Sequence, residues 1–263
     1  MSLVFAGITP HPPLLLPTIG KEETKKVEKT KKAFLQMEQI LYATHPDVIF
    51  IISPHGSYFA DAFTLNVCPE YETDFSEFGD ISTKTKFKGD SALAYKIRKA
   101  VSAQNLPLAT IGEKKLDHGS SVPLCFLTSH LKNTTILQFG FCNLTAKQHI
   151  EFGNVLQEVI SNSNKRIAVI ASGDMSHALT SDSPAGYSPD GKKFDTKIQD
   201  LLSHQSISGM LQLTPEFIDS SAECGFRSLL ILMGILQGVN CSYRQLNYEA
   251  PYGVGYLSAY YEI

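Results

Sequence analysis

The sequence predicts an α/β fold: a single domain, residues 1–263, in which helices flank a central, mostly parallel or mixed sheet. Strongly apolar segments typical of buried strands alternate with segments in which apolar residues recur at helical spacing. Three of the predicted strands lead into a histidine, His11, His55 or His177. No repeat, low-complexity tract or linker divides the chain, and its 263 residues suit one large α/β domain.

The bulk composition excludes several classes of protein. With 43% hydrophobic and 19% charged residues, the chain can form a substantial core. A net charge of −3 offers no basic surface for nucleic acid. The apolar N-terminus lacks a basic leader and is interrupted by prolines, so neither a signal peptide nor a membrane span is predicted. Five cysteines without a CxxC pair predict free thiols in a reducing compartment. We therefore expect a cytoplasmic protein with no nucleic-acid or membrane partner.

The three histidine-bearing strands have clear ends. The apolar residues 4–8 meet three prolines within 10–13, and proline cannot donate to a strand ladder, so the strand stops before His11. Residues 48–52 lead into His55, and residues 167–171 lead into His177. Sites in open α/β sheets are built at the carboxyl ends of strands. The sequence therefore predicts one site that the three histidines share.

The remaining elements follow from periodicity and turn chemistry. Helices are predicted over 22–43, 90–103, 145–161, 194–203 and 229–236, and further strands over 63–67, 83–88, 134–141, 243–248 and 256–262. Three polar segments, 70–80, 116–123 and 181–193, are interpreted as loops or turns. The last is the longest, and we expect it to be an ordered surface loop or lid.

Two histidines and one carboxylate on one face of a metal leave open positions that suit Fe(II) in oxygenases. His11 and His55 form the natural pair because each follows a strand and is held by prolines. Glu223 is the natural carboxylate, since it precedes a glycine at the start of an apolar helix. The alternative is that Glu223 only caps that helix near its positive end. Cys224 is either a thiolate ligand or a small buried apolar residue.

Two further histidines are candidates for proton transfer. Asp117 precedes His118, and Asp174 lies three residues before His177. A histidine with a pKa near 6.5 can take up and return protons at neutral pH, and a nearby acid can fix its tautomer. The alternative for His118 is a turn residue that hydrogen-bonds the backbone.

Taken together, the motifs resemble a known family. The segments 9–13 (Thr-Pro-His-Pro-Pro), 53–56 (Ser-Pro-His-Gly), 117–119 (Asp-His-Gly), 172–177 (Ser-Gly-Asp-Met-Ser-His), 223–225 (Glu-Cys-Gly) and 248–256 are similar, in this order, to segments of the class III extradiol ring-cleavage dioxygenases, catalytic B-type subunit. The resemblance covers nearly the whole chain. It implies a single α/β domain that cleaves the ring of a small aromatic diol, a catechol, and adds both atoms of O₂.

The resemblance also implies residue roles. It assigns Fe(II) to His11, His55 and Glu223, makes His177 the active-site acid/base, and places His118 near substrate and oxygen. Asp174 would orient His177. Relatives of this kind can work as homo-oligomers or with a small companion subunit.

A second relative remains open. The Memo proteins share the fold and the Asp-x-x-His motif, seen here from Asp174 to His177, but have a cysteine followed by glycine where the glutamate should be. This chain has both Glu223 and Cys224, and adjacent side chains usually point to different sides. The alternative function is therefore a Memo-like metal-binding protein that acts as a redox or interaction scaffold without ring cleavage.

Overall fold

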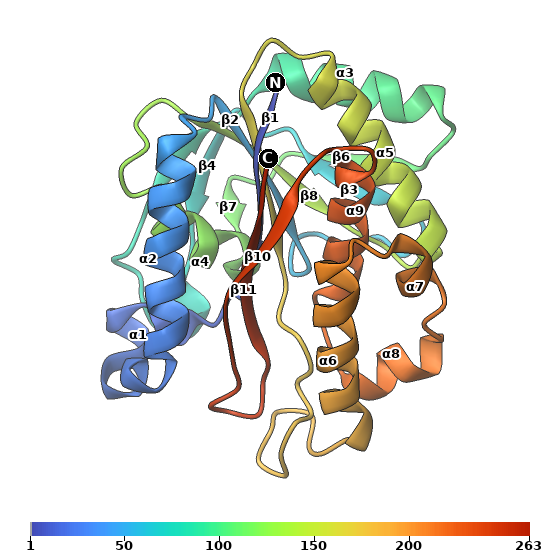
Figure 1. Cartoon of the computed structure of the whole chain (residues 1–263). Coiled ribbons are helices and arrows are strands. Elements are labelled where there is room, and N and C mark those ends of the chain that lie inside the picture. Colours follow the sequence, from blue (N-terminus) through green and yellow to red (C-terminus); the bar gives the residue numbers. More distant parts are fainter. Residues whose placement is uncertain (1) are drawn as a thin grey trace.

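The most apolar segments of the chain form the middle of one sheet. In the computed structural model, which describes residues 2–263, eight strands are hydrogen-bonded in the order β10-β11-β1-β9-β2-β8-β3-β6 (Figure 1). They are β1 (Leu3–Thr9), β2 (Val48–Ser53), β3 (Phe63–Asn66), β6 (Leu108–Ile111), β8 (Thr135–Gly140), β9 (Ile167–Ser172), β10 (Ser242–Glu249) and β11 (Tyr256–Glu262). Strands β1, β9, β2 and β8 are parallel, and β11 and β3 flank them antiparallel. The predicted α/β domain with a mixed central sheet is confirmed.

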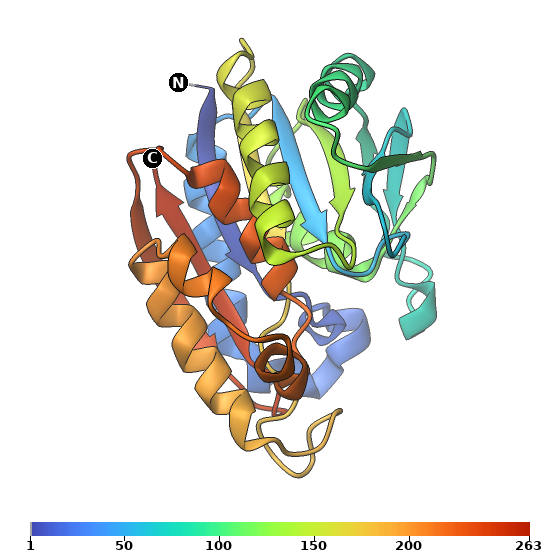
Figure 2. The ribbon, with the colours of Figure 1, turned by 90° about the vertical axis from the view of Figure 1, so that its right-hand side faces the viewer.

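Helices cover both faces of this sheet. On one face lie α2 (Glu28–Ala43) and α4 (His118–Leu127), together with a three-stranded sheet of β5 (Lys86–Lys88), β4 (Glu70–Thr73) and β7 (Lys115–Leu116). On the other face lie α3 (Ser91–Ala103), α5 (Ala146–Ser161), α6 (Pro189–Ser203) and α9 (Phe226–Leu236). Figure 2 shows α5 and α9 side by side against the sheet. Because β2 and β9 are buried throughout, they read as continuous apolar runs rather than as alternating ones.

Short elements complete the chain. They are α1 (Pro17–Gly20), α7 (Ile207–Leu211) and α8 (Pro215–Ser221), and the 3₁₀ turns η1 (Pro13–Leu15), η2 (Lys21–Val27) and η3 (Ser76–Phe78). The helix predicted over 22–43 is therefore divided into η2 and α2. The capping box predicted for α5 is present: Thr145 accepts from the backbone of Gln148, whose side chain reaches back to the cap. None of the helices in the described part of the chain is both long and apolar enough to cross a membrane.

Three segments interpreted as loops or turns contain regular structure, so those predictions were wrong. The segment 70–80 holds β4 and η3, because its glutamates face the lysines of β5 across the strand pair. The segment 116–123 contains the last residue of β7 and the start of α4. Its polar residues form the capping turn, in which Asp117 accepts from the backbone N–H of Ser120. The segment 181–193 ends earlier than predicted, since Ser188 caps α6 and Pro189 is its first residue.

Helices α5 and α9 touch through glycine. A Cβ atom added to Gly153 would lie 2.2 Å from the carbonyl oxygen of Ile231, and one added to Gly234 would lie 2.3 Å from that of Ile150. In both cases the obstacle is backbone, which cannot rotate away as a flexible side chain can. The two glycines therefore set how closely α9 approaches α5, and through it the sheet.

We expect Gly153→Ala to lower the free energy of unfolding by about 1–3 kcal/mol, the usual cost of overpacking. This loss should appear although alanine is the better helix former by about 1 kcal/mol. Urea denaturation measures it. Gly112→Ala is the control, because no heavy atom of residues 2–263, apart from its two chain neighbours, lies within 4 Å of the added Cβ. If both variants unfold at the wild-type midpoint, the close contact has no energetic weight.

Candidate functional site

The parallel pairing of the central strands brings three motifs to one edge of the sheet. Strand β9 lies between β1 and β2 and is parallel to both. The segments that leave these strands therefore emerge together at their carboxyl ends, carrying His11, His55 and, beyond β9, Asp174 and His177. The start of α4 adds His118. The structure thus brings the histidines that follow β1, β2 and β9 to the same edge of the sheet, as the sequence predicted.

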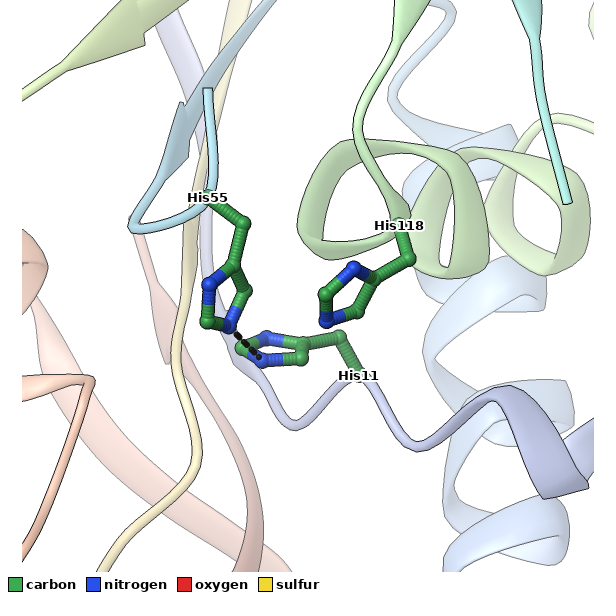
Figure 3. A group of neighbouring side chains, drawn as sticks. All are labelled: His11, His55 and His118. Carbon is green, nitrogen blue, oxygen red and sulfur yellow. Dashed lines mark hydrogen bonds between the residues drawn. The ribbon is translucent and has the colours of Figure 1, made fainter. Parts of the chain in front are cut away.

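Three imidazole rings converge there (Figure 3). The Nε2 atoms of His11 and His55 are 3.0 Å apart. The ring of His118 stacks on that of His55, with centroids 4.3 Å apart, and meets the His11 ring edge-on at 5.4 Å. One nitrogen of each ring lies within 4.8 Å of the other two. Such a group of nitrogen donors could hold a metal ion.

A serine on β9 determines which nitrogen of His11 carries the proton. The hydroxyl of Ser172 donates to the carbonyl of Gly119 at 2.5 Å, and a hydroxyl has only one hydrogen to give. Toward Nδ1 of His11, 3.0 Å away, it must therefore act as acceptor. The Nδ1 of His11 then holds the hydrogen, and the lone pair of Nε2 faces the other histidines.

The same reasoning applies to two other histidines. Nδ1 of His177 lies 2.6 Å from the carbonyl of Ala222, which can only accept, so the neutral ring has its lone pair on Nε2. Nδ1 of His118 lies 3.2 Å from the carboxylate of Glu77. Here too Nδ1 donates and Nε2 is left free. Glu77, rather than Asp117, is thus the acid that orients the His118 ring.

Burial favours neutral imidazoles in the centre of the group. Desolvation is the main reason why the pKa of His11 lies well below its ordinary value, and the neighbouring His118 and His177 lower it further. The pKa of His55 is lowered to about 4, again mainly by burial and then by His11. A neutral ring with a free lone pair is the form in which histidine binds metals.

An acid and a thiol lie next to the histidines. The carboxylate of buried Asp174 accepts from the backbone N–H of His11 at 2.9 Å, and its other oxygen is 3.9 Å from Nε2 of both His11 and His177. Burial raises the pKa of this carboxyl group. The Sγ atom of Cys224 lies 3.7 Å from Nε2 of His11 and accepts from the backbone N–H of Asp174. Burial raises the pKa of the thiol well above its ordinary value.

Glu223 takes a different position from its neighbour. Its carboxylate accepts from the backbone N–H of Phe226 in the first turn of α9. This is the helix-capping arrangement that the sequence left as an alternative. Burial raises the pKa of Glu223 to about 7. The carboxylate is not part of the three-histidine group, and its role as a metal ligand stays a prediction.

Asp117 belongs to a polar network beneath the rings. Its carboxylate accepts from the hydroxyl of Ser53 at 2.5 Å and from the side-chain amide of Gln138 at 2.5 Å, besides capping α4. Sequence reasoning missed Ser53, Ser172, Gln138 and Glu77, because their partners lie far away in the chain. The only signal was the placement of both serines at the last position of a histidine-bearing strand.

A cavity of about 640 Å³ opens beside two of the rings. Its lining includes His55 and His118. We call it the histidine pocket; the other lining residues are Gly56, Ser57, Asp74, Ser76, Glu77, Glu113, Lys115, Leu116 and Asp117. This volume is in the usual range for a small-molecule site. No residue of the expected lid, 181–193, is among the described residues that line it.

Comparison with known proteins agrees with this architecture. The model of the family "catalytic LigB subunit of aromatic ring-opening dioxygenase" matches residues 6–258. A curated protein of Clostridium acetobutylicum is 32% identical over 97% of this chain, which spans 57% of that protein's length. The crystal structure of an uncharacterized Escherichia coli K12 protein shares the fold, with a TM-score of 0.65 and 18% identity over 98% of this chain and 99% of that one. The family match covers almost every element described above, and the chain therefore belongs to the family of catalytic LigB subunits of aromatic ring-opening dioxygenases.

Proposed function

We propose that this protein is a non-haem Fe(II)-dependent extradiol dioxygenase that cleaves a catechol-type ring and adds both atoms of O₂. The observation that carries the proposal is the convergence of His11, His55 and His118 at the carboxyl edge of the sheet, in a chain of the LigB family. The free thiols of all five cysteines support a cytoplasmic location.

The nitrogen donors fit a metal ion of this kind. Two nitrogen ligands about 2.1 Å from one ion and at about a right angle to each other lie about 3.0 Å apart. This is the separation of the two Nε2 atoms of His11 and His55. The hydrogen bond from Nδ1 of His11 to Ser172 is the outer-sphere contact that such a ligand usually makes.

When bound, Fe(II) supplies the open coordination positions and the electron transfer that ring cleavage requires. The chain supplies orientation and proton transfer. Because Nδ1 of His177 is held by the carbonyl of Ala222, its free Nε2 can take a proton from a diol hydroxyl and later return it. Asp174, 3.9 Å from this nitrogen, stabilises the charged ring. His118, which contacts Glu77 and lines the pocket, would donate or accept a hydrogen bond to the substrate.

His11→Ala and His55→Ala should each weaken Fe(II) binding by more than roughly 100-fold, beyond the range typical of outer-sphere residues. Elemental analysis after anaerobic loading measures the bound metal. His204→Ala is the matched control, since the bonds of this exposed histidine to the described residues all lie within the end of its own helix. Full iron content in both test variants would refute the assignment of the two ligands.

The third protein ligand is decided by three more variants in the same assay. The family resemblance favours Glu223, and the geometry offers His118 and Cys224 as alternatives. If the carboxylate of Glu223 leaves the backbone of α9 and binds the ion in the wild type, Glu223→Gln will contain less iron. Retained iron in Glu223→Gln together with loss in His118→Ala or Cys224→Ser identifies the ligand that replaces it.

Replacing His177 by Ala should leave the metal in place and lower kcat by roughly 10²-fold or more, the scale of general acid–base catalysis. The reason is that its Nε2 is free for protons while the ring lies outside the three-histidine group. Metal analysis and oxygen-uptake rates are measured on the same sample. Loss of iron in this variant would instead make His177 a ligand.

One observation favours a second function. The thiol of Cys224, rather than the carboxylate of Glu223, faces His11. Two histidines and a cysteine are the ligands expected of a Memo-like protein, which would bind metal as a redox or interaction scaffold without cleaving rings.

Oxygen consumption by the Fe(II)-loaded protein with a panel of substituted catechols distinguishes the two functions. The dioxygenase should consume one O₂ per diol, and ¹⁸O₂ should label two positions in the ring-opened product. Full iron occupancy without uptake on any diol, and without catechol binding, would leave the scaffold function in its place.

A further inference from the structure

We propose that the histidine pocket selects its substrate by charge, and that it takes an aromatic diol carrying a positively charged amine in preference to one carrying a carboxylate. The inference rests on the proposed function and specifies its substrate class. The pocket is identified by its position beside the rings of His55 and His118, so its location does not depend on the charge of its lining.

The lining of the pocket is strongly acidic. Four carboxylates contribute to it, those of Asp74, Glu77, Glu113 and Asp117, against one cation, Lys115. The ammonium of Lys115 is already paired with Asp74, at 2.7 Å. A ligand that entered the pocket would therefore meet three carboxylates, those of Glu77, Glu113 and Asp117. Within residues 2–263, no lysine or arginine nitrogen lies within 4 Å of them to compensate their charge.

The three carboxylates differ in how they are held. Asp117 accepts hydrogen bonds from neutral donors, namely Ser53, Ser120 and Gln138. Glu77 contacts His118 and is otherwise exposed. Asp117 is therefore held firmly beside the rings, whereas Glu77 is held by its contact with His118 alone among the described residues.

Glu113 is the carboxylate best placed to meet a ligand without disturbing the histidines. Its backbone is fixed on both sides by Asn66, which accepts from its N–H at 3.1 Å and donates to its carbonyl at 2.8 Å. Its exposed side chain accepts from the hydroxyl of Ser57. The two backbone hydrogen bonds keep residue 113 at the pocket, and a substitution of its side chain leaves them intact.

The acidity is local. A second cavity, of about 420 Å³, lies between β5 and the start of β8 and has the opposite character: its lining contains Glu70 and four lysines, Lys86, Lys88, Lys114 and Lys132. The chain as a whole has a net charge of only −3, so the four carboxylates around the histidine pocket are a local accumulation of negative charge that the overall composition does not explain. Concave surfaces lined by one sign of charge raise the local concentration of ligands of the other sign.

A matched trio of diols tests the proposal. We choose 2-(3,4-dihydroxyphenyl)ethylamine, 4-ethylcatechol and 3,4-dihydroxyphenylacetate, which have similar size and the same ring hydroxyls but carry a positive, a neutral and a negative group. Their affinities for the Fe(II)-loaded protein are measured by anaerobic calorimetry, so that no turnover is needed. We expect the amine to bind at least roughly tenfold more tightly than the acid, with the neutral diol between them, since several exposed ion pairs each contribute up to about fivefold.

Glu113→Gln should reduce the ratio between amine and acid by roughly two- to fivefold, the contribution of one exposed pair. Glu158→Gln is the control, because this exposed residue of α5 undergoes the same change of charge away from the pocket. Raising the salt concentration should narrow the ratio in the wild type, because counterions screen exposed charges.

The outcomes separate the two claims. If the diols bind but the acid binds as tightly as the amine or more tightly, the charge selection is refuted and the dioxygenase proposal stands. A ratio that Glu113→Gln leaves unchanged refutes the role of the acidic lining. If none of the three diols binds the loaded protein, the proposed function fails, and the inference built on it fails as well.

Discussion

The parallel pairing of β9 with β1 on one side and β2 on the other is the constraint on which the rest of the molecule depends. Because of this pairing, the carboxyl ends of the three strands lie side by side, about 4.8 Å apart, regardless of the conformation of the loops that follow. Proline stops β1 before His11 and follows β2 directly, before His55. A short segment made stiff by proline at the end of a buried strand fixes the position of its side chains better than a mobile loop does. This restriction brings the Nε2 atoms of His11 and His55 to 3.0 Å from each other.

Burial and hydrogen bonding act together on these rings. Removing water from around His11 and His55 disfavours their charged forms, and the serine at the end of β9 then decides where the remaining proton of His11 lies. That serine can only accept from His11 because its own hydrogen is engaged by the first turn of α4. The hydroxyl of Ser172 therefore links the end of β9 to α4 and also determines the tautomer of His11.

The sequence predicted the sheet and the location of the site well, because both depend on local signals. Apolar runs, prolines and cap residues mark the ends of strands and helices wherever the chain later packs. It failed at β4, β6 and β7, which are short and are held by segments distant in the chain. Within the site, the sequence selected histidines that the structure brings close together. It could not tell that Cys224 would face His11 while Glu223 turned to the backbone of α9, since that depends on how one turn enters the helix. The contacts of His118 and Ser172 span 41 and 53 residues, and no local pattern encodes them.

The two central histidines are surrounded by three kinds of donor: a further imidazole on α4, an oxygen from Asp174, and a sulfur from Cys224. These are, in the same order, an intermediate, a hard and a soft donor, the classes by which proteins discriminate among metals. In the proposed metal site, each of these donors comes from a separate element, so a different third ligand would leave the segments that carry His11 and His55 unchanged. A scaffold of this kind can change its metal, and with it the chemistry it hosts, without having to be refolded around a new centre.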